Sequence, residues 1–287
     1  DHSDRPTPGC PDYYPAILPL REDIAAPKLT PGATWVGDDP GKMEVIAARG
    51  PVLVFFFDFS QLNSVRAMPY VIEWHRRYAD LGLSVIGVQA PRFPFGADPG
   101  TVRTGIERLG VEFPVVIDDR QELWYSYGCE GWPSLFLWGR GGILQWFHFG
   151  EGDYRSTEEA IQASLGKPGA DADLPEPMGA IRETDVQGIE VIAPGAELIP
   201  AEGRAWTIED DGDGFDIEYE GGGIHVTAGG TGRLLTVIDG LPSEAIEIEG
   251  PGLYTLAEHG RHGSHRIEIE LVGSPEIWSV SFSPAVA

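Results

Sequence analysis

The sequence predicts an α/β domain followed by an all-β domain of the sandwich or jelly-roll type. Apolar runs alternate with amphipathic helical segments between residues 51 and 165, which is typical of a sheet covered by helices. From about residue 180 the pattern changes to short runs with two-residue alternation and Gly-rich turns, which predicts antiparallel strands. The expected order is a Pro-rich N-terminal arm (1–30), the α/β domain (31–167), a linker (168–180) and the β-sandwich (181–287).

The α/β domain is organised around its first strand, expected at Val52–Phe57. This unbroken apolar run is short enough to be a strand buried on both faces. After a short polar turn, apolar residues recur at helical spacing, which predicts a helix over about 62–80. The later elements are expected as strands at 82–89 and 113–117, a helix at about 99–109, and a short helix that is capped by Asp118-Asp119 and runs through Tyr127. A hairpin of 132–138 with 143–148 and a last helix at about 156–165, capped by Ser156 or Thr157, complete the domain.

The C-terminal part predicts nine short strands and no helix. Its strand-like runs share alternating apolar residues and are separated by polar or glycine-rich turns. The runs are 189–191, 206–208, 215–219, 224–226, 234–237, 245–248, 253–256, 267–271 and 277–282.

The net charge of −25 argues against binding to nucleic acid, because no basic patch is present to neutralise phosphates. No apolar run approaches the roughly 20 residues that a membrane-spanning helix needs. The sequence also has no phosphate-binding loop, dinucleotide fingerprint or Ser-His-Asp arrangement, so no cofactor is expected.

The stretch from Pro51 to His75 combines the buried strand, an aromatic-rich turn and a helix that contains Met68-Pro69. It resembles the active-site strand, turn and helix of thioredoxin-like proteins of the TlpA and DipZ types, and of the thioredoxin-like domain of NHL-repeat proteins. Those families carry Cys-x-x-Cys at the start of the helix. Aligned without a gap on Met68-Pro69, the two cysteine positions fall on Gln61 and Ser64. The buried acid that these families often carry on the strand corresponds to Phe55.

The resemblance implies a thioredoxin-like fold without its redox dithiol. Dithiol exchange needs a thiolate and a second thiol within reach, and neither Gln61 nor Ser64 supplies one. Trp132-Pro133 corresponds to the family's cis-proline, so a cis peptide bond is expected there. By resemblance, Ser60, Gln61 and Ser64 would form a peptide-binding face together with Trp132-Pro133. The alternative is that the turn is well packed and has only a structural role, without binding a ligand.

Cys10 and Cys129 allow a single internal disulfide, which would pin the N-terminal arm to the domain. Two alternatives remain: Cys129 as a peroxidatic or transfer thiol, and a buried free thiol. The chain begins with Asp1 rather than Met. Together with its composition and the family resemblance, this leads us to expect an extracytoplasmic protein, either periplasmic or secreted.

Three carboxylates at nearby positions, Asp211, Asp213 and Asp216, could wrap a Ca²⁺ ion. We favour a solvated acidic turn, because the distal glutamate and the helices of a calcium-binding hand are missing. The histidines of the segment 259–265 could serve Zn²⁺ or Cu²⁺, yet glycine-rich spacing does not preorganise ligands. No metal site is therefore expected.

The β-sandwich resembles the carbohydrate-binding-module-like domain that follows the thioredoxin domain in DipZ-type proteins. Trp206, Tyr219 and Tyr254 could form a sugar-stacking platform there, although inward-facing core aromatics are the commoner arrangement.

Three hypotheses about function follow. The first is a non-catalytic protein that binds peptides or proteins, or acts as a scaffold, with the sandwich as a ligand-binding module. The second is a thiol-disulfide or peroxidatic enzyme that uses Cys129. The third is a glycan-binding protein that uses its C-terminal domain.

Overall fold

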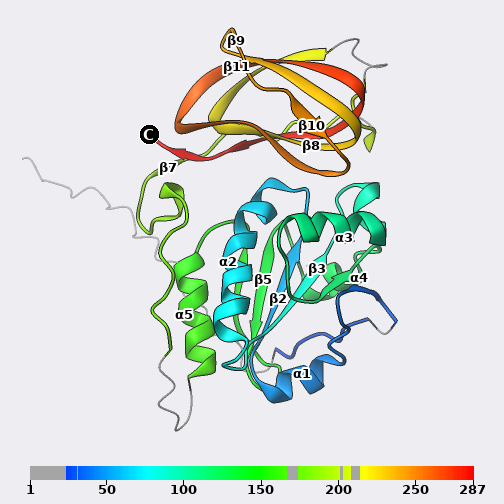
Figure 1. Cartoon of the computed structure of the whole chain (residues 1–287). Helices are drawn as coiled ribbons and strands as arrows, with labels where there is room; N and C mark the ends of the chain where they lie inside the picture. The colour runs from blue at the N-terminus through cyan, green and yellow to red at the C-terminus, as the bar shows by residue number, and fades with distance from the viewer. Residues whose placement is uncertain (1–23, 31, 167–173, 201–202, 208–213) are drawn as a thin grey trace, which may run out of the picture.

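The described part of the chain forms an α/β domain and a strand-rich domain stacked against one end of it (Figure 1). The computed structural model describes residues 24–30, 32–166, 174–200, 203–207 and 214–287. The expected fold class is confirmed. The α/β domain contains β1 (Thr34–Val36), α1 (Met43–Arg49), β2 (Val52–Phe57), α2 (Leu62–Tyr78), β3 (Ser84–Gln89), a 3-10 turn η1 (Pro94–Ala97), α3 (Pro99–Arg108), β4 (Val115–Ile117), α4 (Glu122–Tyr127), β5 (Ser134–Trp138), β6 (Leu144–Phe149) and α5 (Tyr154–Leu165).

The sheet of the α/β domain has the strand order β1-β4-β3-β2-β5-β6. Strands β2, β3 and β4 are parallel, whereas β5, β6 and β1 are antiparallel to their neighbours. All six residues of β2 are fully buried, because helices cover both faces of the sheet. Successive side chains of a strand point to opposite faces. Phe55 accordingly stacks on Phe57 beneath α2, while Phe56 meets Trp124 of α4 on the other side.

The cap expected at Ser156 or Thr157 was placed wrongly, since α5 begins at Tyr154. The residue before its first turn is Asp153, which has the left-handed φ of 48°. Its backbone carbonyl accepts the first helical hydrogen bond, from Thr157 N–H at 2.9 Å. The Thr157 hydroxyl lies inside the domain and accepts a hydrogen bond from Trp146 Nε1 at 3.2 Å.

The C-terminal domain is built from two long, bent strands rather than nine short ones. Six of the nine expected runs join into β8 (Gly214–Ile238) and β11 (Gly252–Ser283). Residues 223–228 of β8 pair with two separate parts of β11, 252–258 and 277–283. The short elements of this half are η2 (Glu183–Asp185), β7 (Val191–Ile192), β9 (Leu241–Pro242), β10 (Ile246–Ile248) and β12 (Ala285–Val286).

Glycine permits the sharp bends that carry these strands from one layer to the next. Gly230 has φ +69°, and a Cβ atom there would lie 2.2 Å from the carbonyl oxygen of Ser274. No other residue type fits such a position without moving the backbone. The sequence pattern could not show that the runs continue through these glycines, because glycine also marks turns.

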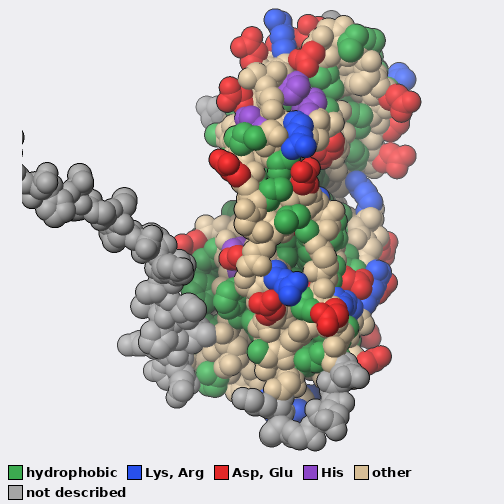
Figure 2. Space-filling model, turned by 90° about the vertical axis from the view of Figure 1, so that its left-hand side faces the viewer, with side chains coloured by type: hydrophobic (Ala, Val, Ile, Leu, Met, Phe, Trp, Pro, Cys, Tyr) green, Lys and Arg blue, Asp and Glu red, His purple; other side chains and the backbone are tan. Residues whose placement is uncertain are grey.

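Acidic side chains are spread over both domains on the face that Figure 2 presents, rather than gathered in one patch. This distribution agrees with the net charge of −25. Within the described ranges, no helix has both the length and the apolar character needed to cross a membrane.

Candidate functional site

The turn between β2 and α2, together with the first turn of α2, contains Gln61 and Ser64, the two residues that the resemblance aligns with the cysteines of thioredoxin-like proteins. Gln61 is the N-cap residue of α2, and its Oε1 accepts a hydrogen bond from Ser64 N–H at 2.7 Å. The Ser64 hydroxyl is fully buried and accepts a hydrogen bond from Asp58 N–H at 3.3 Å. A side-chain cap satisfies one of the backbone donors that a helix start leaves open. Both side chains therefore serve the structure of the turn.

Asp58 is a fully buried carboxylate that the sequence interpretation missed. Its Oδ1 accepts hydrogen bonds from Ser60 N–H at 2.8 Å and from the Ser60 hydroxyl at 2.6 Å, and its Oδ2 accepts one from Arg92 N–H at 2.7 Å. Burial raises the pKa of Asp58, while the bonds from Ser60 and Arg92 act in the opposite direction. An Asp two residues before a polar turn residue is a known turn signal, and Asp58-Phe59-Ser60 fits it.

The Trp132-Pro133 peptide bond is cis, as expected. Trp132 stacks on Trp124, with ring centroids 4.3 Å apart, and donates its indole N–H to the carbonyl of Ala90 at 2.8 Å. Pro133 is buried, and its carbonyl accepts a hydrogen bond from Gly150 N–H at 2.8 Å. This loop is thus fixed by contacts inside the domain.

The strand-rich domain covers the turn. Thr227 of β8 donates its hydroxyl to the carbonyl of Ser60 at 2.7 Å, and both residues are fully buried. Beside this contact, Arg92 forms a bidentate ion pair with Glu197, with N–O distances of 3.0 and 2.7 Å. Trp278 of β11 packs against the rings of Phe93 and Phe95. These last contacts join segments more than 100 residues apart, so no local pattern could predict them.

The five residues expected to form a binding face are therefore not equally accessible. Ser60, Ser64 and Pro133 are buried, and only Gln61 and Trp132 are partly exposed. Ser60 contacts the chain's second domain through its carbonyl, whereas Ser64 and Pro133 are held by hydrogen bonds within the first domain, so the five residues do not form the open face that the sequence suggested.

No protein-family model matches the chain. Among curated proteins, it is 28% identical to protein DipZ of Mycobacterium bovis over 296 residues, which covers 90% of this chain and 42% of that protein. The chain thus spans less than half the length of this relative, but the similarity extends over both domains. It is also 28% identical over 102 residues to the thiol-disulfide oxidoreductase ResA of Bacillus thuringiensis, which covers 36% of this chain and 54% of that protein.

The first domain has a thioredoxin-like fold. The NHL repeat-containing protein 2 of Bos taurus is 26% identical over 142 residues, covering 49% of this chain and 20% of that protein. Among solved structures, a thiol-disulfide isomerase of Corynebacterium glutamicum aligns with a TM-score of 0.43 and 24% identity, covering 50% of this chain and 98% of that one. The expected resemblance to thioredoxin-like proteins of the DipZ and NHL-repeat types is confirmed.

Cys129 lies just after the C-cap of α4 in the thioredoxin-like domain and is partly exposed. Burial raises the pKa of its thiol to about 12, against a smaller opposite effect of a hydrogen bond with Ser134. A thiol with so high a pKa stays protonated near neutral pH, and the thiolate is the reactive form. The expected pairing with Cys10 lies outside the described residues.

The expected calcium ligands fall largely outside the described part of the chain, since Asp211 and Asp213 are not among its residues. Asp216 is exposed and pairs with Arg266. Among the histidines, His265 pairs with Asp239 at 2.8 Å. The described residues contain no group of three or more His, Cys, Asp or Glu side chains placed to hold a metal ion.

The aromatic residues considered for sugar binding are engaged separately. Trp206 packs on Phe215, and Tyr254 lies beneath the guanidinium of Arg108 in the thioredoxin-like domain. Tyr219 is only 5% exposed and stacks on a neighbouring phenylalanine of the core. Each of the three has its own set of packing partners.

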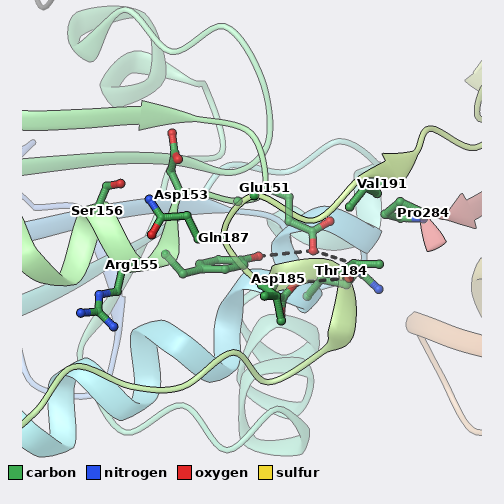
Figure 3. A pocket seen from close by; sticks show the side chains of 14 residues that line it. Glu151, Asp153, Arg155, Ser156, Thr184, Asp185, Gln187, Val191 and Pro284 are labelled. Carbon is green, nitrogen blue, oxygen red and sulfur yellow. Dashed lines mark hydrogen bonds and ion pairs between the residues drawn. The ribbon is translucent and has the colours of Figure 1, made fainter. Parts of the chain in front are cut away.

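A polar cavity of about 330 Å³ lies where the two domains and their connection meet (Figure 3). One wall is the ion pair between Arg66 of α2 and Glu151, at 2.7 Å, in which both side chains are largely buried. Burial raises the pKa of Glu151, and the nearby Arg66 and Arg182 oppose that rise. The Thr184 hydroxyl lies beside this pair and accepts a hydrogen bond from Arg66 at 3.1 Å, and Val191 and Pro284 also line the cavity.

Proposed function

We propose that this protein is a non-catalytic member of the thioredoxin-like fold, which acts as a scaffold or as a peptide- or protein-binding protein. The observation that carries the proposal is that the residues aligned with the family's two cysteines, Gln61 and Ser64, make structural hydrogen bonds. Gln61 caps helix α2, and Ser64 accepts a hydrogen bond from the backbone of Asp58. Neither position holds a sulfur atom, and both side chains have structural partners.

Thiol-disulfide exchange proceeds by attack of a thiolate on a disulfide, followed by resolution through a second thiol. The turn offers no nucleophile, because the start of a helix does not ionise the hydroxyl of Ser64. Cys129 is the one cysteine among the described residues, and its raised pKa disfavours the thiolate. The relatives that are named oxidoreductases therefore support a thioredoxin-like fold for this chain more than they support thiol-disulfide exchange by it.

The binding role rests on backbone groups beside the turn. In the thioredoxin-like families that the chain resembles, the residue before the cis-proline presents its backbone to an extended peptide, and Trp132 has that place in this chain. Here the carbonyl of Ser60 is already paired with Thr227, while Gln61 and Trp132 keep partial exposure. The β domain is proposed as the ligand-binding module, and an extracytoplasmic location is proposed from the composition and the family resemblance.

The test of catalysis is an insulin-reduction assay with dithiothreitol, using a thioredoxin as positive control. We expect no turnover above the uncatalysed rate for the full chain. Turnover that disappears in Cys129→Ser would overturn the proposal and establish a thiol enzyme. Binding is tested separately with reduced, carboxymethylated α-lactalbumin, which is a permanently unfolded chain. Saturable binding that Trp132→Ala weakens is the expected result, and the absence of binding leaves only the scaffold role.

A further inference from the structure

The β domain meets the thioredoxin-like domain at the point where that domain would be open to a ligand. Ser60 and Ser64 are fully buried in the complete chain, and Thr227 supplies the hydrogen bond to the Ser60 carbonyl. We infer that the β domain is a hinged cap, held closed by a polar latch, and that an extended peptide reaches the turn only when the cap lifts. The identity of the ligand rests on the proposed function, whereas the cap does not.

The latch is the ion pair between Arg92 and Glu197. The two groups are 12% and 26% exposed, and they form two parallel N–H···O bonds. The Ser281 hydroxyl donates a further hydrogen bond to Glu197 at 3.0 Å. Burial alone would raise the pKa of Glu197, but the bonds and charge of Arg92 bring it below its ordinary value, so the latch stays ionised at neutral pH. Charge-assisted, bidentate pairs are the stronger class of hydrogen bond.

On the face of the β domain that contacts the thioredoxin-like domain, two buried polar atoms lack hydrogen bonds, which favours a contact that can open. Trp278 Nε1 is buried and has no hydrogen-bond partner among the described residues, and the buried His225 Nε2 makes no hydrogen bond although a carboxylate oxygen of Glu258 lies 3.5 Å away. A buried polar atom without a partner costs about 1–3 kcal/mol, and opening to water removes that cost. The hydrophobic cores of the two domains consist of separate sets of residues, so lifting the cap leaves both cores intact.

The chain between the domains has a fixed part and a free part. The fixed part is held to α2, because the Tyr70 hydroxyl accepts from Ile181 N–H at 2.7 Å and donates to Asp185 at 2.8 Å. On the other side, β7 belongs to the β domain through its pairing with β12. Between them, residues 186–188 are exposed, and Gly188 has φ +82°. This short stretch borders the cavity of Figure 3 and is the hinge.

The inference is tested by the accessibility of a thiol placed under the cap. Ser60→Cys is introduced into the full chain, and the rate of maleimide labelling at position 60 is followed by peptide mass spectrometry, which separates it from Cys10 and Cys129. Adding Glu197→Gln is expected to speed labelling about tenfold, because the charged latch is lost. The matched control is Glu247→Gln, which removes an exposed ion pair of the β domain with Arg233 and should leave the rate unchanged.

Equal labelling rates with and without Glu197→Gln would overturn the cap, as would an equal acceleration by Glu247→Gln. If Ser60→Cys does not fold, hydrogen exchange decides in the otherwise unaltered chain. Glu197→Gln should then raise exchange in peptides that cover residues 58–65, and no increase would refute the inference.

The two proposals can fail separately, because labelling involves no peptide. Faster labelling without any binding of carboxymethylated α-lactalbumin supports the cap and removes the peptide-binding role. Binding that is equally strong with and without Glu197→Gln, together with unchanged labelling, supports peptide binding and overturns the cap.

Discussion

His225 gives a prediction about acid stability that can be worked from the structure. The residue lies in β8 and is only 3% exposed. Its Nδ1 is 3.1 Å from the Thr255 hydroxyl, and its Nε2 is 3.5 Å from a carboxylate oxygen of Glu258. Burial lowers the pKa of His225 from 6.5 to about 4, with a smaller contribution from the charge of Arg66. The folded protein therefore holds this imidazole neutral.

The sign and size of the effect follow from linkage. Below pH 6.5 the unfolded chain takes up a proton at this position and the folded protein does not, so stability falls as the pH drops towards 4. The difference between the two pKa values limits the loss to about 3.4 kcal/mol. Between about pH 7 and about pH 4.5 the expected loss is about 2 kcal/mol.

The assay is urea denaturation of the wild type and of His225→Gln, followed by circular dichroism across this pH range. Carboxylates with raised pKa values, such as Asp58 and Glu151, make the folded protein more stable on acidification. Only the difference in the free energy of unfolding between the two proteins therefore reports the effect of His225. The wild type should lose about 2 kcal/mol more than the variant between about pH 7 and about pH 4.5. Parallel pH curves would refute the reasoning.

Two further predictions concern the thioredoxin-like domain. Gln61→Ala removes the cap of α2 and should lower the free energy of unfolding by about 1 kcal/mol, measured by urea denaturation; an unchanged midpoint would show that the cap contributes nothing. Arg77→Ala leaves the carboxylate of Glu158, which is 1% exposed, without its ion-pair partner and should cost about 3–5 kcal/mol in a thermal melt. The control Arg76→Ala breaks an exposed pair and should barely move the melting temperature, so equal effects of the two would contradict the role of burial.

Much of the first domain could be predicted because its signals are local. The apolar run Val52–Phe57 is β2, and the helical spacing that begins at Leu62 is α2. The short helix α1 was not predicted, because it offers only a few apolar positions and its N-cap residue makes no side-chain bond. Asp58 was overlooked because its role depends on the path of the turn and on Arg92, which is 34 residues away.

The candidate site was predicted less completely, because part of it is formed by contacts between residues that lie far apart in the sequence. The family resemblance pointed to Gln61 and Ser64, but it could not show that the carbonyl of the neighbouring Ser60 accepts a hydrogen bond from Thr227, 167 residues away. The sequence around a single threonine in a strand does not indicate which residue its hydroxyl will contact. The same holds for Glu197, which lies 105 residues from Arg92 in a stretch without regular structure.

The hydrogen bonds made by Gln61 and Ser64 limit how such a turn could acquire a redox-active dithiol. Cysteine at both positions would remove the side-chain cap of α2 and alter the acceptor of Asp58 N–H at the same time. The new sulfur atoms would also follow Ser60 in the turn, where the second domain contacts the backbone through Thr227. A working dithiol would therefore require changes in both domains together. In evolutionary terms, the turn and its cover would have to change as one unit.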